Sequence, residues 1–262
     1  MILRAPAKVN LCLRVGPLRQ DGYHRLTTLF QAIDRYDELE LCEADETTVE
    51  GFPDDTLVAG ALAALGETRR VRLDKRIPVA AGLGGGSSDA AAVLRALRGG
   101  RDPNELHAIA RALGADVPFF LTGAETGFGT GRGDRIQPLP DFPRGHAFVL
   151  VPSDQGLSAA DVFAAGEPNP IFRAVEGDLV RAMHTVRRVE DVAALMANDL
   201  EPAVLRLRPE VGEALAALRR RGALAAIVSG SGPTAFGLFR HREDAEAAAA
   251  ARIPGAFAAS PV

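Results

Sequence analysis

Hydrophobic and polar residues alternate over residues 8–15, and this period of two predicts a β-strand. The apolar positions share one face, which we expect to pack into the core: Val9, Leu11, Leu13 and Val15. The opposite face carries a lysine and an asparagine two residues apart, Lys8 and Asn10. Spacing alone leaves two interpretations of this face open, a solvated strand surface or two polar side chains held side by side at a site.

Further elements are predicted wherever the hydrophobic period is close to two or to 3.6 residues. Strands are expected over 26–33, 37–43, 71–75, 147–151, 224–229, 234–239 and 256–262, the first two in an antiparallel sheet. Helices are expected over 55–65, 90–97, 102–113, 159–165, 171–186, 191–205, 209–221 and 242–252. Residues 123–140 are rich in glycine, threonine and proline and mark the predicted boundary between domains 1–140 and 141–262. After this boundary the order strand, helix, strand, strand, helix, strand is that of a ferredoxin-like domain, so the predicted fold class is α+β.

A glycine-rich loop joins the strand predicted at 71–75 to the helix predicted at 90–97, which Ser88 or Asp89 is expected to cap. Its glycines leave the backbone N–H groups accessible to a bulky anion at the positive end of a helix. The sequence therefore predicts a phosphate-binding loop. A flexible glycine linker is the alternative, which the flanking strand and helix disfavour.

This loop differs from the two commonest phosphate loops. Gly86 is followed by two serines, whereas a P-loop needs Gly-Lys-Ser/Thr at this point. Ser87 also stands where the dinucleotide-binding fingerprint needs a glycine. Neither a P-loop NTPase nor a Rossmann dehydrogenase is therefore favoured.

Three more short stretches carry candidate chemistry. Asp116 lies between Gly114 and an apolar run, so it is either a cap or turn residue or a carboxylate that orients or deprotonates a hydroxyl, with Lys8 keeping it ionised. Tyr23 and His24 follow the predicted turn at Asp21-Gly22. They are either part of an ordinary surface turn or side chains that hold a planar ligand. Residues 229–232 are a plain hairpin connection or a second backbone wall around a phosphate.

Composition limits the class of protein. The 262 residues carry a net charge of −4 and no basic block, which argues against a nucleic-acid partner. The N-terminus lacks the apolar core of a signal peptide, and no apolar run is long enough to cross a bilayer. Cys12 and Cys42 lack metal-ligand spacing and are expected to be small buried hydrophobic residues in a reducing cytoplasm. A cytoplasmic globular protein without membrane contact is predicted.

Three segments together resemble the GHMP kinases: 6–11, 78–88 and 229–235. Residues 21–24, 114–118 and the double serine at 87–88 are similar to the branch of that family that phosphorylates a cytidine diphosphate-linked methylerythritol in the non-mevalonate isoprenoid pathway. The resemblance covers the whole chain in the right order. It implies a two-domain GHMP kinase fold with an N-terminal ribosomal protein S5 domain 2-like domain and a C-terminal ferredoxin-like domain.

The resemblance also implies roles for individual residues. Lys8 and Asp116 match the catalytic pair, and Asn10 matches a residue that steadies the substrate. Tyr23 and His24 match the positions that recognise cytosine, with Phe163 as the second aromatic ring of the base sandwich. The ATP-binding loop would comprise Pro78, Val79, Ala80, Ala81, Gly82, Leu83, Gly84, Gly85, Gly86, Ser87 and Ser88.

The same resemblance implies ATP and Mg²⁺ as cofactors. No cluster of carboxylates marks a metal cage, so we expect Mg²⁺ to arrive with ATP and to touch Ser87 or Ser88. This chain has alanines at 80–81, where related loops often carry glycine. Ser158-Ala159-Ala160 stand where the family often has Pro-Thr-Pro, and Ser158 could supply the missing substrate contact. The expected assembly is a monomer or a weak homodimer.

Two alternatives to this function stay open. One is another small-molecule kinase of the superfamily, of the homoserine or mevalonate type, whose substrate has no base for Tyr23 and His24 to bind. The other is a non-catalytic phosphate- or RNA-binding module. The acidic net charge and the pairing expected between Lys8 and Asp116 argue against that module.

Overall fold

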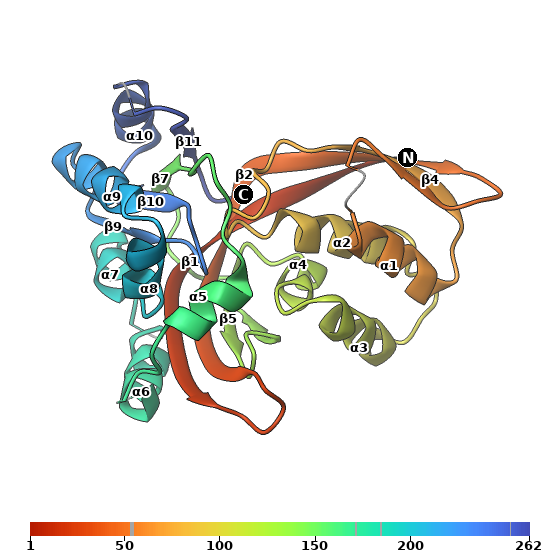
Figure 1. Ribbon diagram of the computed structural model, residues 1–262, viewed down its shortest axis with the longest axis horizontal. Helices are drawn as coiled ribbons and strands as arrows, with labels where there is room; N and C mark the ends of the chain where they lie inside the picture. The colour runs from red at the N-terminus through yellow and green to blue at the C-terminus, as the bar shows by residue number, and fades with distance from the viewer. Residues whose placement is uncertain (53–54, 171, 184, 252) are drawn as a thin grey trace.

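Two long antiparallel strands, β1 (Ile2–Leu18) and β2 (His24–Glu43), run through the centre of the molecule (Figure 1). They belong to a computed structural model that describes residues 1–52, 55–170, 172–183, 185–251 and 253–262. In the first sheet they are flanked by β3 (Thr48–Glu50), β4 (Arg69–Asp74) and β8 (Ala197–Asn198) in the order β3-β4-β2-β1-β8. The hairpin of β5 (Thr126–Thr130) and β6 (Arg135–Pro138) pairs with β2 through β5.

Four helices lie together against the first sheet, on the right in Figure 1: α1 (Leu57–Leu65), α2 (Gly85–Ala96), α3 (Pro103–Leu113) and α4 (Val117–Thr122). Their apolar faces and the sheet share one cluster of buried residues that includes Phe30, Leu62, Leu94 and Phe119. Local sequence signals set two helix ends. As predicted, α1 ends at Gly66 in the left-handed region with φ 65°, and Asp102 caps α3 by accepting a hydrogen bond from Asn104 N at 2.8 Å.

The second sheet has the strand order β11 (Phe257–Ala259), β7 (Ala147–Val151), β10 (Ala235–Phe239), β9 (Ala225–Val228), and all its pairs are antiparallel. The helices of this half are α5 (Ala159–Ala165), α6 (Phe172–Met183), α7 (Val189–Leu195), α8 (Glu201–Leu207), α9 (Glu210–Arg220) and α10 (Arg242–Ala250). In chain order the first and third strands, β7 and β10, are central, which confirms the predicted ferredoxin-like arrangement. Ile171 and Arg252, where two of the predicted helix limits fall, lie outside the described residues.

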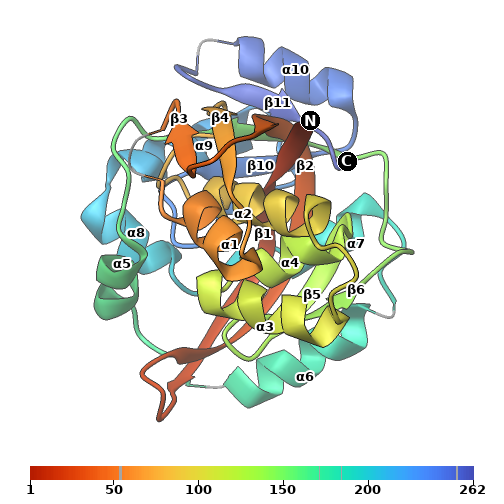
Figure 2. The same ribbon diagram turned by 90° about the vertical axis from the view of Figure 1, so that its right-hand side faces the viewer.

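The two halves are packed against each other, as Figures 1 and 2 show. One buried cluster contains Leu11 and Phe128 from the first sheet together with Phe148 and Phe236 from the second. β8 pairs in parallel with β1, and Pro261 forms an isolated bridge with Ile33 of β2. The face of β1 that carries Leu11 is therefore buried between the two halves.

Two element predictions were wrong. The strands predicted at 26–33 and 37–43 are one strand, β2, because the polar residues between them form a bulge: Pro6 pairs with Tyr36, but Ala7 pairs with Ile33. The helix predicted at 191–205 is interrupted by β8. There the Asn198 side chain donates to Val228 O at 2.8 Å and accepts from Leu200 N at 2.9 Å, so tertiary contacts override the helical pattern.

Candidate active site

The helix after the glycine loop begins earlier than predicted. α2 starts at Gly85, with Gly84 at the N-cap in the left-handed region (φ 71°), and Ser88 N already donates to Gly84 O at 2.9 Å. The prediction that Ser88 or Asp89 caps this helix was therefore wrong, because both lie inside it. The N–H groups at 85–87 belong to its first turn and have no acceptor within the helix, so they remain available for an anion.

Ten of the eleven predicted ATP-binding residues, Pro78 through Ser87, line one groove of about 280 Å³. This volume is near the lower limit of ligand pockets, about 300–1,000 Å³. Its wall is completed by Phe52, Asp55, Leu57, Lys75 and Asp89. Ser88 does not line the groove; it is buried, and its hydroxyl has no hydrogen-bond partner among the described residues. Ala80 adopts φ 52°, a left-handed conformation that favours the glycine common in related loops.

The second glycine turn lies against this loop. Ser229 Oγ donates to Gly82 O at 3.0 Å, and Thr234 N donates to Ala81 O at 3.3 Å. A Cβ on Gly82 (φ 78°) would lie 2.3 Å from Ser229 O, so only glycine permits this approach. The turn is therefore a hairpin connection between β9 and β10 that also braces the glycine loop.

Lys8 is buried, with 2% of its surface exposed, so the interpretation of its strand face as solvated was wrong. Its ammonium group donates to Asn10 Oδ1 at 2.6 Å and to Gly82 O at 2.8 Å. It also lies 3.3 Å from Asp116 Oδ2. The glycine loop and α4 cover this part of β1, and together they bring the predicted catalytic pair into contact.

Asp116 occupies the N-cap position of α4, but its side chain makes no capping hydrogen bond. The carboxylate pairs with Lys8 instead and remains 31% exposed. Asn10 is held at both ends of its amide, because its Oδ1 accepts from Lys8 and its Nδ2 donates to Thr28 Oγ1 at 2.8 Å. Thr28 was not predicted as a site residue, since a threonine in a strand gives no signal of such a contact.

The predicted base-binding residues lie at the β1–β2 turn and on α5. The His24 and Phe163 rings are stacked with their centroids 5.8 Å apart and an interplanar angle of 22°. His24 Nδ1 lies 2.8 Å from Gly16 O. Because a carbonyl only accepts, Nδ1 must carry the proton, which leaves Nε2 of the neutral ring as an acceptor. Tyr23 is 53% exposed, and the Arg132 guanidinium carbon lies 4.7 Å from its ring centroid.

Sequence and structure comparisons identify the family. The family models described as GHMP kinases N terminal domain and GHMP kinases C terminal match residues 56–124 and 179–256. Proteins named 4-diphosphocytidyl-2-C-methyl-D-erythritol kinase are similar over most of the chain. The one from Cutibacterium acnes is 40% identical over 95% of this chain and 89% of its own length, and the one from Anaeromyxobacter sp. is 44% identical over 94% and 84%. The chain belongs to the 4-diphosphocytidyl-2-C-methyl-D-erythritol kinase family.

Solved structures agree with membership in this kinase family. A crystal structure of 4-(cytidine 5'-diphospho)-2C-methyl-D-erythritol kinase covers 99% of this chain and 98% of its own, at a TM-score of 0.75 and 37% identity. A homoserine kinase from Cytophaga hutchinsonii has a TM-score of 0.71 over 100% of this chain and 94% of its own. At 18% identity, that likeness shows the fold alone. The predicted GHMP kinase fold and the use of ATP are confirmed.

A buried ion-pair network lies beside the kinase groove and was not predicted. The Lys75 ammonium contacts Asp37 Oδ2 and lies 2.8 Å from Asp89 Oδ2. Asp37 Oδ1 accepts from the N–H groups of Arg76 and Ile77, at 2.6 and 2.7 Å. Burial raises the pKa of Asp89 to about 7, although Lys75 opposes this change. The network joins β2 to the start of α2 and so helps to set the wall of the groove.

Part of this network could also serve a metal ion. Ser87 and Asp89 line the groove, and Asp89 Oδ1 is buried without a hydrogen-bond partner in the described structure. Two oxygen donors fit a Mg²⁺ ion that is held mainly by phosphates and water. Within the described ranges no three His, Cys, Asp or Glu side chains form a group able to hold a metal ion by themselves.

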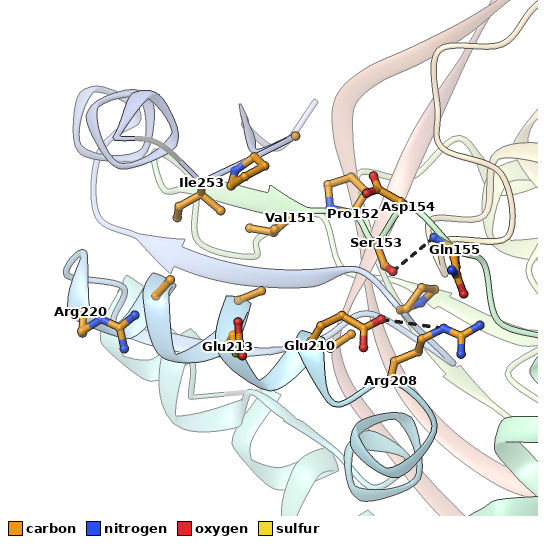
Figure 3. Close-up of a pocket in the computed structure, with 16 residues that line it drawn as sticks. Val151, Pro152, Ser153, Asp154, Gln155, Arg208, Glu210, Glu213, Arg220 and Ile253 are labelled. Atoms are coloured by element: carbon orange, nitrogen blue, oxygen red, sulfur yellow. Dashed lines mark hydrogen bonds and ion pairs between the residues drawn. The ribbon is translucent and has the colours of Figure 1, made fainter.

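A larger cavity, of about 720 Å³, lies elsewhere in the kinase, between α9, β7 and the segment 253–255 (Figure 3). It is lined by side chains of both signs, among them Arg208, Arg220 and Glu213. None of the predicted site residues, all of which the structure describes, contributes to its wall. We therefore assign the chemistry to the smaller groove, because Gly82 in its wall accepts a hydrogen bond from Lys8, which pairs with Asp116.

The two cysteines differ in burial, so the prediction of two buried thiols is correct for one of them. Cys12 is buried as predicted, and burial raises its pKa to about 11, so its thiol is unreactive. Cys42 is only partly buried. No helix in the described part of the chain combines the length and the hydrophobicity needed to cross a bilayer.

Proposed function

We propose that this protein transfers the γ-phosphoryl group of ATP to the 2-hydroxyl of 4-diphosphocytidyl-2-C-methyl-D-erythritol, as the names of its relatives suggest. The observation that carries the proposal is the contact of Lys8 with both Asp116 and Gly82, at 3.3 and 2.8 Å. One cation thereby joins a carboxylate to a glycine loop. This arrangement suits phosphoryl transfer to an alcohol, which depends on positioning and on stabilisation of charge.

In the proposed mechanism Asp116 accepts or orients the proton of the substrate hydroxyl. Lys8 keeps Asp116 ionised and offsets negative charge that develops during transfer. Two observations support these roles. Lys8 is fully enclosed, so its charge is poorly screened by water, and the Asp116 carboxylate is partly exposed and can reach a substrate.

ATP is proposed to lie in the groove formed by residues 78–87, with its phosphates at the free N–H groups of the first turn of α2. Ser87 and Asp89 would hold the Mg²⁺ that accompanies ATP. When bound, this ion supplies charge neutralisation of the phosphates. The predicted role of Ser88 as a phosphate or metal contact is the less supported one, because its side chain is buried away from the groove.

The cytosine base is proposed to stack on Tyr23 and to lie beside His24 and Phe163. His24 Nε2 can accept a hydrogen bond from the cytosine amino group, since Nδ1 is already committed to Gly16 O. Asn10 is proposed to steady the substrate next to Lys8. Ser158 immediately precedes α5, and its side chain makes no capping hydrogen bond there, so it is proposed as the replacement substrate contact.

The remaining proposals concern the whole molecule. We infer a cytoplasmic location, because the reaction consumes ATP, and a monomer or weak homodimer with a small-molecule partner. The division into functional units 1–140 and 141–262 is retained, supported by family matches that each fall within one unit.

The proposed function is tested by ATP consumption with purified protein and Mg²⁺. Turnover is expected with 4-diphosphocytidyl-2-C-methyl-D-erythritol, and the product should carry phosphate on its 2-hydroxyl by phosphorus NMR. Homoserine and mevalonate serve as controls, since neither contains a base for Tyr23. Equal turnover of either compound would refute the assignment of substrate.

A further inference from the structure

The exposed ring of Tyr23 contacts Arg132, a residue that has no role in the proposed reaction. The Arg132 guanidinium carbon lies 4.7 Å from the centroid of the Tyr23 ring. Tyr23 belongs to the turn between β1 and β2, whereas Arg132 belongs to the turn between β5 and β6. The contact therefore joins two turns that are distant in sequence.

The backbone of Tyr23 is well fixed, but its ring depends on this contact. Tyr23 O accepts from Arg19 N at 2.8 Å, and Tyr23 N donates to Asp21 Oδ1 at 3.2 Å. The side chain nevertheless remains 53% exposed. A guanidinium group stacks on one face of an aromatic ring and leaves the opposite face open to a ligand.

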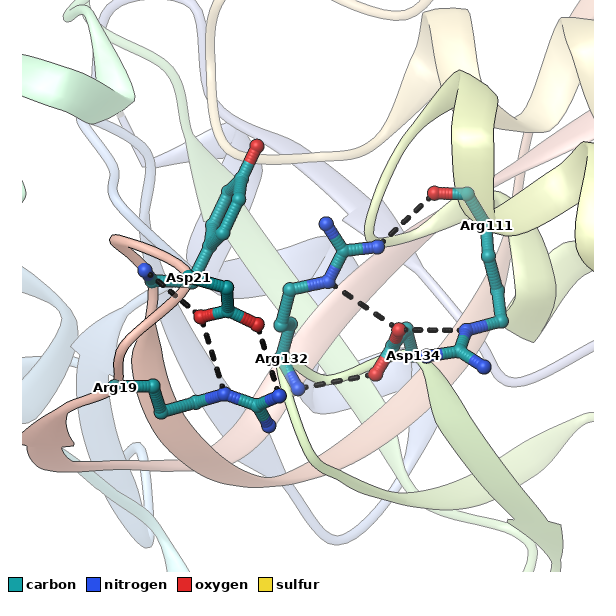
Figure 4. Close-up of polar contacts among 6 residues, drawn as sticks. Arg19, Asp21, Arg111, Arg132 and Asp134 are labelled. Carbon is teal, nitrogen blue, oxygen red and sulfur yellow. Dashed lines mark hydrogen bonds and ion pairs between the residues drawn. The ribbon is translucent and has the colours of Figure 1, made fainter.

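Arg132 itself is held rigidly, as Figure 4 shows. Asp134 is 1% exposed and accepts from Arg132 N at 3.0 Å and from Arg132 Nε at 3.3 Å. Arg132 Nη2 donates to Arg111 O at 3.0 Å, and Arg111 Nε also donates to Asp134, at 2.8 Å. The plane of the guanidinium is thus fixed by two contacts of its own, Nε to the Asp134 carboxylate and Nη2 to the backbone oxygen of Arg111, so it can act as a platform for the ring above it.

We infer that Arg132 is a positioning residue for nucleotide recognition: it holds the Tyr23 ring in the orientation in which the free face stacks on the cytosine base. This inference rests on the proposed base-stacking role of Tyr23. An exposed aromatic side chain that is already ordered loses less conformational entropy when a ligand binds. Arg132 therefore acts on the affinity for the cytidine-containing substrate, and neither on ATP nor on the chemical step.

The first test is the kinetics of Arg132→Met, which keeps the length of the side chain but removes the planar cation. The Michaelis constant for the cytidine-linked substrate should rise roughly three- to tenfold, the scale of one cation–π contact and one ordered side chain. The turnover number and the Michaelis constant for ATP should stay within about twofold. Arg132→Lys keeps the charge without the plane and should behave like Arg132→Met; full rescue by lysine would overturn the role of the stacked plane.

The second test uses fluorescence, because the chain contains two tyrosines and no tryptophan. In a Tyr36→Phe background all tyrosine emission comes from Tyr23. Cytidine diphosphate should quench this emission, and Arg132→Met should weaken the measured binding by the same factor as in the kinetics. Arg132→Met should also lower the anisotropy of Tyr23 in the free, folded protein, which reports greater mobility of the ring.

Two matched controls separate positioning from damage to the fold. Arg111→Met removes the other side-chain donor to Asp134 without touching Tyr23, and should leave substrate binding unchanged. Arg4→Met removes the same type of contact from the other tyrosine, since the Arg4 guanidinium carbon lies 3.9 Å from the Tyr36 centroid. In a Tyr23→Phe background it should alter the Tyr36 emission, and in the Tyr36→Phe background it should leave the Tyr23 emission unchanged.

The outcomes distinguish the inference from the function on which it rests. If wild-type protein binds cytidine diphosphate without any change in Tyr23 emission, base stacking on Tyr23 is refuted, and the inference with it. If wild type responds normally and Arg132→Met responds equally well, only the inference is overturned. A fall in turnover number, or an equal loss in Arg111→Met, would also overturn it, because either result would assign Arg132 a purely structural role.

Discussion

Lys8 Nζ lies 3.3 Å from Asp116 Oδ2, and this contact joins the first strand of the chain to the start of α4. Lys8 is enclosed by the protein, while Asp116 remains partly open to solvent. The two residues of the pair therefore differ in their exposure to solvent. The lysine has a structural environment that fixes its position, and the aspartate presents an oxygen to the space from which a substrate would approach.

Replacing Asp116 by asparagine should reduce the turnover number by at least roughly 10²-fold, the usual scale for loss of a catalytic acid–base group. Steady-state kinetics at saturating ATP and substrate measure this change. Asp102→Asn is the matched control, because it makes the same chemical change at an exposed helix cap, where asparagine caps about as well as aspartate. Nearly normal turnover of Asp116→Asn would remove this carboxylate from the mechanism.

The residues that sequence alone could predict are those whose signals are local. The caps of α1 and α3 and the strand β7 follow from a few neighbouring residues, and the structure has them where they were predicted. The start of α2 was missed because glycine has a low helix propensity, so Gly85 and Gly86 looked like loop residues. Their place in the helix depends on the surrounding packing rather than on propensity.

The residues of the candidate site also divide into those with a local sequence signal and those without one. Lys8 and Asp116 were candidates from their local sequence and from the family resemblance, while Thr28, Lys75 and Arg132 were not found. These three act through partners distant in sequence: Thr28 through Asn10, Lys75 through two buried carboxylates, and Arg132 through a ring on another turn. No hydrophobic period or spacing reports such contacts, because they exist only after the sheets have packed.

Removing the Tyr23 ring should weaken binding of the nucleotide-linked substrate selectively. Stacking of a base on an aromatic ring contributes about 1–3 kcal/mol, so Tyr23→Ala should raise the Michaelis constant for this substrate about 5- to 150-fold. The Michaelis constant for ATP should change by less than about twofold. Tyr23→Phe retains the ring and is the control. An equal rise in both Michaelis constants for Tyr23→Ala would argue against base stacking.

The contact between the two glycine turns can be tested at Gly82. Alanine at this position would be strained, since φ is 78° and a Cβ would lie 2.3 Å from Ser229 O. The two turns must then separate, so the catalytic efficiency with ATP should fall at least roughly tenfold. Steady-state kinetics with varied ATP measure the change.

Gly66→Ala is the matched control for this prediction. Gly66 has a similar φ of 65°, but a Cβ there meets nothing within 4 Å. This variant should lose about 1 kcal/mol of stability, the cost of a left-handed alanine, and keep its kinetic constants. If Gly82→Ala lost stability alone and kept its affinity for ATP, the groove would not depend on the second turn.

The stability of the protein should fall between pH 7 and pH 5 because of His146. This side chain is 2% exposed, and neither ring nitrogen has a hydrogen-bond partner among the described residues. Burial lowers its pKa from 6.5 to about 4. Between these two values the unfolded chain binds a proton that the folded protein does not, so the free energy of unfolding decreases as the pH falls through 6.5 and levels off below 4.

From this difference we expect wild-type protein to lose about 2 kcal/mol of unfolding free energy between pH 7 and pH 5 through this one group. Urea denaturation at the two pH values measures the loss. His146→Leu removes the titrating ring and should show a smaller loss by about the same amount, whereas the exposed His241→Leu should follow wild type. Because both variants are compared with themselves at the two pH values, any cavity left by leucine cancels. Identical losses in wild type and His146→Leu would show that His146 is hydrated or paired in solution, contrary to its buried environment in the structure.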